Sequence, residues 1–186
     1  MNLPKKCINP IGVSSFQCFT PEQVKEINKK IKENIWSRQD PADAARGATK
    51  IGDFFYVPCP PMMDLLHPWM YECQTINLEY FGYDIYWNFH LDKFTYNEYG
   101  EGGEYQWHAD ANRGEQPVDI KLTCLLNLSE EPYEGGDFYT ILDKQDLLGY
   151  PENEPMKFTS GQAMVFNPLL AHKVTPVTKG KRITLA

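Results

Sequence analysis

The sequence predicts an α+β fold that is mainly β, in which N-terminal helices support an antiparallel sandwich or barrel. Three observations lead to this prediction. Amphipathic helical patterns dominate the chain up to Gly82, short alternating segments dominate it afterwards, and glycine-containing turns separate those segments. Aromatic residues make up 13% of the 186 residues, which suits a β-rich interior.

Two helices are expected before Gly82. Residues 20–35, TPEQVKEINKKIKENI, start with a good N-cap, Thr20, and a proline at the first helical position, Pro21. A glutamine three residues after the cap completes a capping box, and four apolar residues share one helical stripe. A second helix is expected over residues 61–81, begun by a proline pair and ended at Gly82.

The second half of the chain has the pattern of short strands. The segment DIYWNFHLDKFTYNEY alternates and is rich in aromatic residues. Further strands are expected, in order, over residues 119–128, 136–142, 162–167, 172–177 and 182–185. We therefore expect one domain over residues 1–186, with helical support in 1–84 and the β core in 85–186.

Composition argues against several classes of partner. The net charge is -7 and no large basic cluster is present, so a nucleic-acid partner is not expected. No apolar run is long enough for a membrane span, and no signal-peptide pattern is present. Five cysteines without a Cys-x-x-Cys motif predict reduced thiols in a cytoplasmic protein. Because the last expected strand runs to the end of the sequence, we expect a C-terminal tail that this sequence lacks.

Two His-x-Asp triplets raise the question of a metal site. In a strand, residues i and i+2 point to the same face, so each triplet would bring an imidazole and a carboxylate together. A distant histidine would complete a 2-His-1-carboxylate face with open positions, which favours non-haem Fe(II). The first triplet, His90 and Asp92, has no polar pattern around it, so a surface or packing pair is its simpler interpretation.

The second triplet, His108 and Asp110, is accompanied by further segments that indicate a functional site. It follows the glycine-rich segment YNEYGEGGEYQW, and the later segment AHKVTPVTKGKR places His172 at a strand start and Arg182 in the next strand. Histidine is the commonest neutral metal ligand, and arginine binds carboxylates through two parallel hydrogen bonds. Three metal ligands and one guanidinium suit a small dicarboxylate that chelates the metal at one end.

Residues 85–185 resemble the Fe(II)- and 2-oxoglutarate-dependent dioxygenase superfamily, above all its prolyl 4-hydroxylase-like branch with bacterial and phage relatives. The resemblance rests on a loosened Tyr-x-x-Gly-x-x-Tyr-x-x-His-x-Asp pattern over residues 99–110. It rests also on four strings in the same order: DIKLTCLLNL, EEPYEGGDF, FTSGQAMVFNP and HKVTPVTKGKRITL. It implies a double-stranded β-helix, or jelly roll, over residues 85–186, with the N-terminal helices packed on the sheet.

The resemblance implies a role for each of these residues. His108, Asp110 and His172 would bind Fe(II), and no catalytic side chain is implied beyond the metal centre. Arg182 would pair with the distal carboxylate of 2-oxoglutarate, and Tyr99 matches a tyrosine that donates a hydrogen bond to the same carboxylate.

Further residues are weaker candidates. Thr184 shares a strand face with Arg182, and Thr123 could line the cosubstrate site from another strand, although threonine is also common in strands. The candidates for substrate contact are Tyr105, Trp107, Arg113 and Tyr133. Tyr99 and Tyr105 have an alternative reading as core aromatics with satisfied hydroxyls.

The implied reaction is hydroxylation with Fe(II), 2-oxoglutarate and O2, with ascorbate as an optional reductant. Related halogenases replace the carboxylate ligand with a small residue, so Asp110 favours hydroxylation. The resemblance favours a prolyl residue of a peptide or protein as the substrate. Alternatives are a free amino acid or small metabolite, and a non-catalytic jelly-roll binding module. A nucleic-acid demethylase is disfavoured by the acidic charge, and the oligomeric state stays open.

Overall fold

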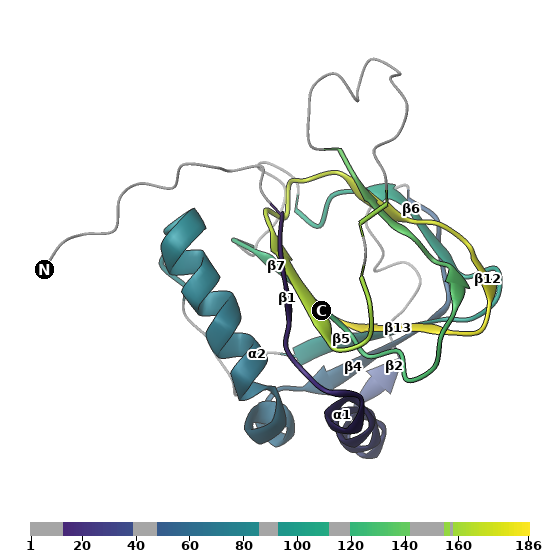
Figure 1. Ribbon diagram of the computed structural model, residues 1–186, viewed down its shortest axis with the longest axis horizontal. Helices are drawn as coiled ribbons and strands as arrows, with labels where there is room; N and C mark the ends of the chain where they lie inside the picture. Colours follow the sequence, from purple (N-terminus) through teal and green to yellow (C-terminus); the bar gives the residue numbers. More distant parts are fainter. Residues whose placement is uncertain (1–12, 39–47, 86–92, 112–119, 142–154, 157) are drawn as a thin grey trace, which may run out of the picture.

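The computed structural model describes residues 13–38, 48–85, 93–111, 120–141, 155–156 and 158–186. Its strands form two larger antiparallel sheets whose inner faces meet, and two helices lie against the outer side of one sheet (Figure 1). None of the helices in this part of the chain has the length and apolar character needed to cross a membrane.

The larger sheet has seven strands and forms the base of the molecule. Its spatial order is β1 (Val13–Gln17), β10 (Gln162–Phe166), β7 (Thr123–Asn127), β13 (Arg182–Leu185), β5 (Lys93–Tyr99), β4 (Asp53–Pro58) and β2 (Ser37–Arg38). All of its pairs are antiparallel. Strands from both ends of the chain therefore lie side by side.

The smaller sheet has four strands and carries half of the candidate site. Its order is β3 (Lys50–Ile51), β6 (Glu104–His108), β11 (His172–Val174) and β9 (Phe138–Thr140). Two further strands, β8 (Glu134–Gly135) and β12 (Val177–Lys179), pair with each other in a two-stranded ribbon. In the chain, β8 comes directly before β9 and β12 directly after β11. The two sheets form the jelly roll that the sequence predicts.

Two helices cover the outer face of the larger sheet. Helix α1 (Pro21–Glu33) begins with the expected capping box, in which Thr20 and Gln23 each accept a hydrogen bond from the other's backbone N–H. Helix α2 (Met63–Ile76) follows the short helix η2 (Pro60–Met62) and continues into the π-helical turn η3 (Asn77–Phe81). Gly82 ends it in the left-handed conformation, at φ 68°.

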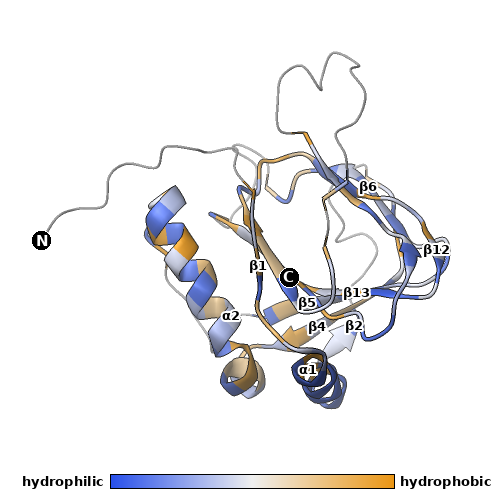
Figure 2. Cartoon of the chain, in the orientation of Figure 1, coloured by the Kyte–Doolittle hydropathy of each residue, from blue (hydrophilic) through white to orange (hydrophobic). Residues whose placement is uncertain are grey.

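The main hydrophobic core lies between these helices and the sheet. Its buried side chains come from both helices and from the outward-facing positions of the central strands, among them Val24, Ile27, Leu66, Trp69, Phe94, Leu126, Val165 and Leu185. Figure 2 shows hydrophobic residues along β4 next to the helices, whereas the visible side of α1 is hydrophilic. On the opposite face of the sheet, strands β5 and β13 carry the buried polar side chains of Asn97, Arg182 and Thr184.

The N-terminal part differs from the expectation in one respect. Residues 1–84 were expected to be helical support, but β1, β2, β3 and β4 lie there and belong to the two sheets. The longest of them, β4, contains the apolar run FFYVP, which pairs along its whole length with β5. A short apolar run is typical of a strand that is covered on both faces, which agrees with the place of β4 in the sheet.

Candidate metal centre

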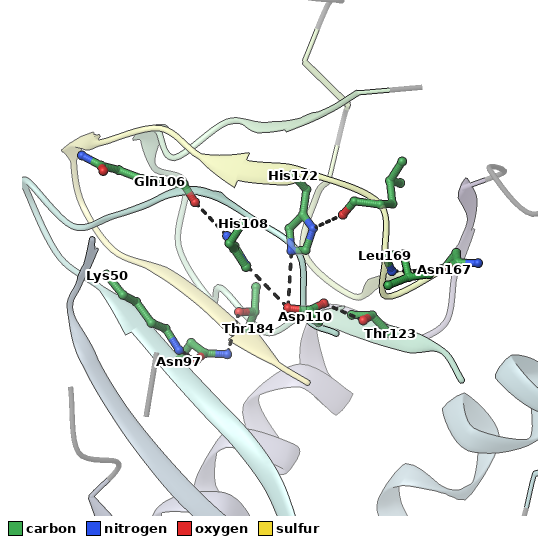
Figure 3. Close-up of polar contacts among 11 residues, drawn as sticks. Lys50, Asn97, Gln106, His108, Asp110, Thr123, Asn167, Leu169, His172 and Thr184 are labelled. Atoms are coloured by element: carbon green, nitrogen blue, oxygen red, sulfur yellow. Dashed lines mark hydrogen bonds and ion pairs between the residues drawn. The ribbon is translucent and has the colours of Figure 1, made fainter. Parts of the chain in front are cut away.

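The two candidate histidine ligands lie opposite each other on neighbouring strands. His108 ends β6, His172 begins β11, and the two residues are register partners in the smaller sheet. Asp110 follows β6, and its Oδ1 lies 3.5 Å from His108 Nε2 and 3.7 Å from His172 Nε2 (Figure 3). One ligand atom from each of the three residues lies within 4.8 Å of the others, a spacing that could hold a metal ion.

Backbone carbonyl groups set the orientation of both imidazoles. His108 Nδ1 lies 2.7 Å from the carbonyl oxygen of Gln106, and His172 Nδ1 lies 2.8 Å from that of Leu170. Because a carbonyl oxygen only accepts, each Nδ1 carries the proton and each Nε2 presents its lone pair. Two nitrogen lone pairs and a carboxylate oxygen therefore converge on one point, an arrangement that a divalent cation stabilises.

The electrostatic state of the triad suits metal binding at neutral pH. Burial alone would raise the pKa of Asp110, but its interactions with His108, His172 and the Thr123 hydroxyl outweigh burial and hold the pKa below its usual range. Burial also lowers the pKa of His172, although the charge of Asp110 opposes this shift. An ionised carboxylate and a neutral imidazole are the forms that bind metals.

The hydroxyl group of Thr123 orients the carboxylate. Its Oγ1 donates a hydrogen bond of 2.5 Å to Asp110 Oδ2, which leaves Oδ1 for the centre of the triad.

We expect Thr123→Val to lower the Mn(II) affinity by about tenfold to a hundredfold, because outer-shell hydrogen bonds contribute on this scale. Calorimetric titration checks this, and Thr123→Ser should restore most of the affinity. Equal affinities of Thr123→Val and wild type would show that Thr123 has no such role.

Arg182 lies on the inner face of the larger sheet and is 1% exposed. Its Nε and Nη2 make no hydrogen bond with any residue that the structure describes. The guanidinium lies 5.4 Å from the ring centre of Tyr99, its register partner on β5, and 5.7 Å from that of Phe158. A buried guanidinium with unsatisfied donors is costly, so this arrangement calls for an anionic ligand.

Tyr99 and Thr184 lie beside Arg182, as the sequence predicts. Burial raises the pKa of Tyr99, so its hydroxyl stays protonated and can donate a hydrogen bond. Thr184, two residues after Arg182, is 2% exposed and accepts a hydrogen bond of 3.4 Å from Asn97 Nδ2. The inner faces of β5 and β13 thus form one polar surface around the guanidinium.

The backbone of Gly136 lies close to the Arg182 side chain. It has φ +63°, and a Cβ atom placed there would lie 3.0 Å from Arg182 Cδ and 3.3 Å from Tyr133 Cε2. Tyr133 itself lies within reach of Asn127 Nδ2 and the carbonyl oxygen of Phe158, both at 3.3 Å. The structure therefore places Tyr133 next to Arg182.

We expect Gly136→Ala to weaken 2-oxoglutarate binding by about fivefold to tenfold, through displacement of the Arg182 side chain, while Mn(II) affinity is kept. Gly102→Ala is the matched control, because Gly102 has φ +79° but no atom near its Cβ position. Both variants carry a comparable cost of the left-handed backbone, about 1–2 kcal/mol. Equal 2-oxoglutarate affinities in the two variants, measured by calorimetry, would contradict this role of Gly136.

The remaining candidates have diverse positions. The ring of Tyr105 stacks on His108 at 3.4 Å between ring centres, so this residue borders the triad. Trp107 is 39% exposed and carries the ammonium group of Lys173 over its ring at 4.9 Å. Arg113 and the first triplet, residues 90–92, lie outside the residues that the structure describes.

Two polar residues near the triad were missed by the sequence analysis. Asn97 lies two residues before Tyr99 on the same face of β5, a spacing that could have revealed it. Lys50 lies on β3, a strand of two residues, and its Nζ donates a hydrogen bond of 3.2 Å to Asn97 Oδ1 (Figure 3). No motif surrounds Lys50 in the sequence, so only strand pairing reveals its position.

Comparison with known proteins connects these features to one family. Residues 94–186 match the family model described as the 2OG-Fe(II) oxygenase superfamily. A PKHD-type hydroxylase of Alteromonas mediterranea is 34% identical over 95 residues, which cover 47% of this chain and 38% of the relative. A PKHD-type hydroxylase of Caulobacter vibrioides is 33% identical over 93 residues, with the same coverage of 47% and 38%. The chain thus spans about two fifths of the length of the curated relatives it matches.

Solved structures share the fold over nearly the whole chain. A prolyl-4-hydroxylase of Pseudomonas putida has a TM-score of 0.61 and 18% identity, covering 94% of this chain and 89% of its own. The viral collagen prolyl hydroxylase of Paramecium Bursaria Chlorella virus-1, in its 2OG complex, has a TM-score of 0.63 and 15% identity, with coverage of 93% and 92%. At these identities the likeness concerns the fold.

Proposed function

Because the chain belongs to the 2OG-Fe(II) oxygenase superfamily, we propose that it is an Fe(II)- and 2-oxoglutarate-dependent dioxygenase that hydroxylates a peptide or protein residue, with proline as the favoured target. One observation carries the proposal. The triad of His108, Asp110 and His172 lies between the same two sheets as the buried guanidinium of Arg182, whose Nε and Nη2 have no described partner.

The donor set of the triad fits a divalent iron ion. Two neutral imidazoles and one carboxylate on one side leave coordination positions open on the other, which is the pattern of non-haem Fe(II) oxygenases. The chemistry that Fe(II) would supply when bound is oxidative decarboxylation of 2-oxoglutarate by O2, in which one oxygen atom enters succinate, carbon dioxide leaves, and the other oxygen atom enters a C–H bond of the substrate. In this chain, Gln106, Leu170 and Thr123 hold the three ligand side chains in place.

The inner face around Arg182 fits the distal carboxylate of 2-oxoglutarate. A guanidinium can donate two parallel hydrogen bonds to one carboxylate, and burial excludes the water that would compete for them. The protonated hydroxyl of Tyr99 adds a donor beside it, and Thr184 adds a polar side chain two residues further along β13. The chain thus holds and orients the cosubstrate through groups whose charge does not have to change when the cosubstrate binds.

The names of the relatives support a peptide or protein substrate. Curated relatives are named PKHD-type hydroxylases, and several similar structures are prolyl hydroxylases. One of these, from Trichoplax adhaerens, is in complex with a hypoxia inducible factor peptide fragment.

The substrate assignment is tested with Fe(II)-loaded protein, 2-oxoglutarate, O2 and matched peptides that contain proline or alanine at one position. We expect the proline peptide to stimulate succinate formation and to gain the mass of one oxygen atom on that proline. Succinate without stimulation by any proline peptide would contradict the peptide substrate and favour a small molecule. Folded, metal-loaded protein that forms no succinate would favour a binding module.

A further inference from the structure

The metal centre is most accessible on the side of Asp110. The side chain of Asp110 is 28% exposed, whereas the side chains of His108 and His172 are 3% and 5% exposed. A molecule that enters from solvent therefore approaches the triad past the carboxylate rather than past the imidazoles. The residues that flank Asp110 border the path of the prime substrate, which is the molecule to be oxidised.

The turn over residues 167–170, which leads toward β11, flanks Asp110. The carbonyl oxygen of Pro168 accepts a hydrogen bond of 3.1 Å from the backbone N–H of Ala111, the residue directly after Asp110. Figure 3 shows Leu169, which belongs to this turn, close to the Asp110 side chain. The turn is therefore fixed against the segment that carries the carboxylate ligand.

Hydrogen bonds hold the 167–170 turn in one conformation. The side-chain oxygen of Asn167 accepts a hydrogen bond of 2.9 Å from the N–H of Leu169, and its carbonyl oxygen accepts one of 2.9 Å from the N–H of Leu170. The carbonyl oxygen of Leu170 lies 2.8 Å from Nδ1 of His172. A side chain on this turn can contact a ligand without the entropic cost of ordering a loop.

The two leucines of the turn have different surroundings. Leu170 is buried and packs in the core cluster that contains Phe138, Phe166 and Val174, whereas Leu169 is 40% exposed. Single exposed leucines are common on protein surfaces, so exposure alone assigns no role. Leu169 differs because it is held beside the accessible side of the metal centre. Burying this side chain against an apolar group would stabilise a complex formed there.

We propose that Leu169 is a specificity-determining residue that contacts an apolar side chain of the prime substrate, next to the residue that is oxidised. The inference rests on the proposed oxygenase function. It narrows the peptide substrate to one in which an apolar side chain neighbours the target proline. In this assignment Leu169 selects the substrate, while the triad and Arg182 hold the metal and the cosubstrate.

The test compares three pentapeptides with a central proline. One has leucine directly before the proline, one has leucine directly after it, and one has serine at both positions. The measured quantity is kcat/KM for peptide-stimulated succinate formation by the Fe(II)-loaded protein, with saturating 2-oxoglutarate and O2. We expect the wild type to prefer one leucine peptide over the serine peptide by about fivefold to fiftyfold, because apolar surface is buried on both partners.

Variants link this preference to Leu169. Leu169→Ser should reduce the preference to about twofold or less, and Leu169→Met should keep most of it, because methionine retains the apolar surface. Both variants should bind Mn(II) and 2-oxoglutarate with the wild-type Kd. Leu78→Ser is the matched control, because Leu78 is also exposed but lies on η3, away from the metal centre. Thermal melts confirm that each variant is folded.

Two results would overturn the assignment and leave the oxygenase function intact. The first is a wild type that hydroxylates all three peptides with equal kcat/KM. The second is a Leu169→Ser variant that keeps the wild-type preference, or loses it only together with Mn(II) affinity, which would assign Leu169 to the positioning of His172. Succinate formation that no peptide stimulates would overturn the peptide substrate and this assignment with it. Folded, metal-loaded wild type that forms no succinate would instead contradict the proposed function, on which the inference rests.

Discussion

Replacing His108 by alanine is expected to abolish binding of a divalent metal. The three ligand atoms lie within 4.8 Å of one another, and His108 Nε2 is held toward the centre by the hydrogen bond at its Nδ1. Loss of a ligand should cost more than loss of an outer-shell residue, so we expect Mn(II) affinity to fall by more than about a hundredfold. Calorimetry with Mn(II), and the rise in melting temperature on Mn(II) addition, both measure this.

Two other histidines serve as controls for this prediction. His67 lies exposed on α2, where its ring stacks on Tyr71, and His90 belongs to the first triplet, outside the described residues. His67→Ala and His90→Ala should bind Mn(II) with wild-type affinity. If His90→Ala lost the metal and His108→Ala kept it, the metal centre would lie at the other triplet.

Arg182→Met should strongly weaken 2-oxoglutarate binding while it leaves Mn(II) binding intact. Truncating one partner of a buried charge pair costs about 2–5 kcal/mol, so we expect the Kd of 2-oxoglutarate to rise by about two to three orders of magnitude. The unliganded variant should melt at the wild-type temperature or above it, because an unpaired buried guanidinium destabilises the folded state. The stabilisation of the wild type by 2-oxoglutarate should disappear.

A surface arginine separates this effect from a general loss of charge. Arg38 is exposed and pairs with Asp53, so Arg38→Met should keep wild-type 2-oxoglutarate affinity. Arg182→Lys should bind 2-oxoglutarate with intermediate affinity, since lysine keeps the charge but loses the parallel hydrogen bonds. Wild-type affinity in Arg182→Met would contradict the assigned position of the distal carboxylate.

Local signals in the sequence were enough to predict the helices and to place His108 and Asp110 on one face. The capping box at Thr20 and the glycine at 82 mark helix ends by short-range chemistry, and the structure confirms both. The pair of His108 and Asp110 could be assigned to one face because residues two apart in extended chain share a side. The roles of His172 and Arg182 came from the resemblance of their segment to the dioxygenase superfamily.

The rest of the site depends on strand pairing between distant segments. Lys50 reaches the site because β3 pairs with β6, and no pattern in a two-residue strand predicts that partner. Tyr133 lies beside Arg182 because β8 pairs with β12, whereas the sequence offered it only as a candidate for substrate contact. Long-range register is fixed by the whole fold, so local sequence patterns do not determine it.

The measurement that tests the central claim most directly is succinate formation by the purified wild type, loaded anaerobically with Fe(II) and then supplied with 2-oxoglutarate and O2. The account predicts succinate that requires all three components, is absent in His108→Ala, and at limiting 2-oxoglutarate is nearly absent in Arg182→Met. Succinate that persists in His108→Ala, or its absence from folded and metal-loaded wild type, would contradict the claim that this triad and guanidinium form an oxygenase site.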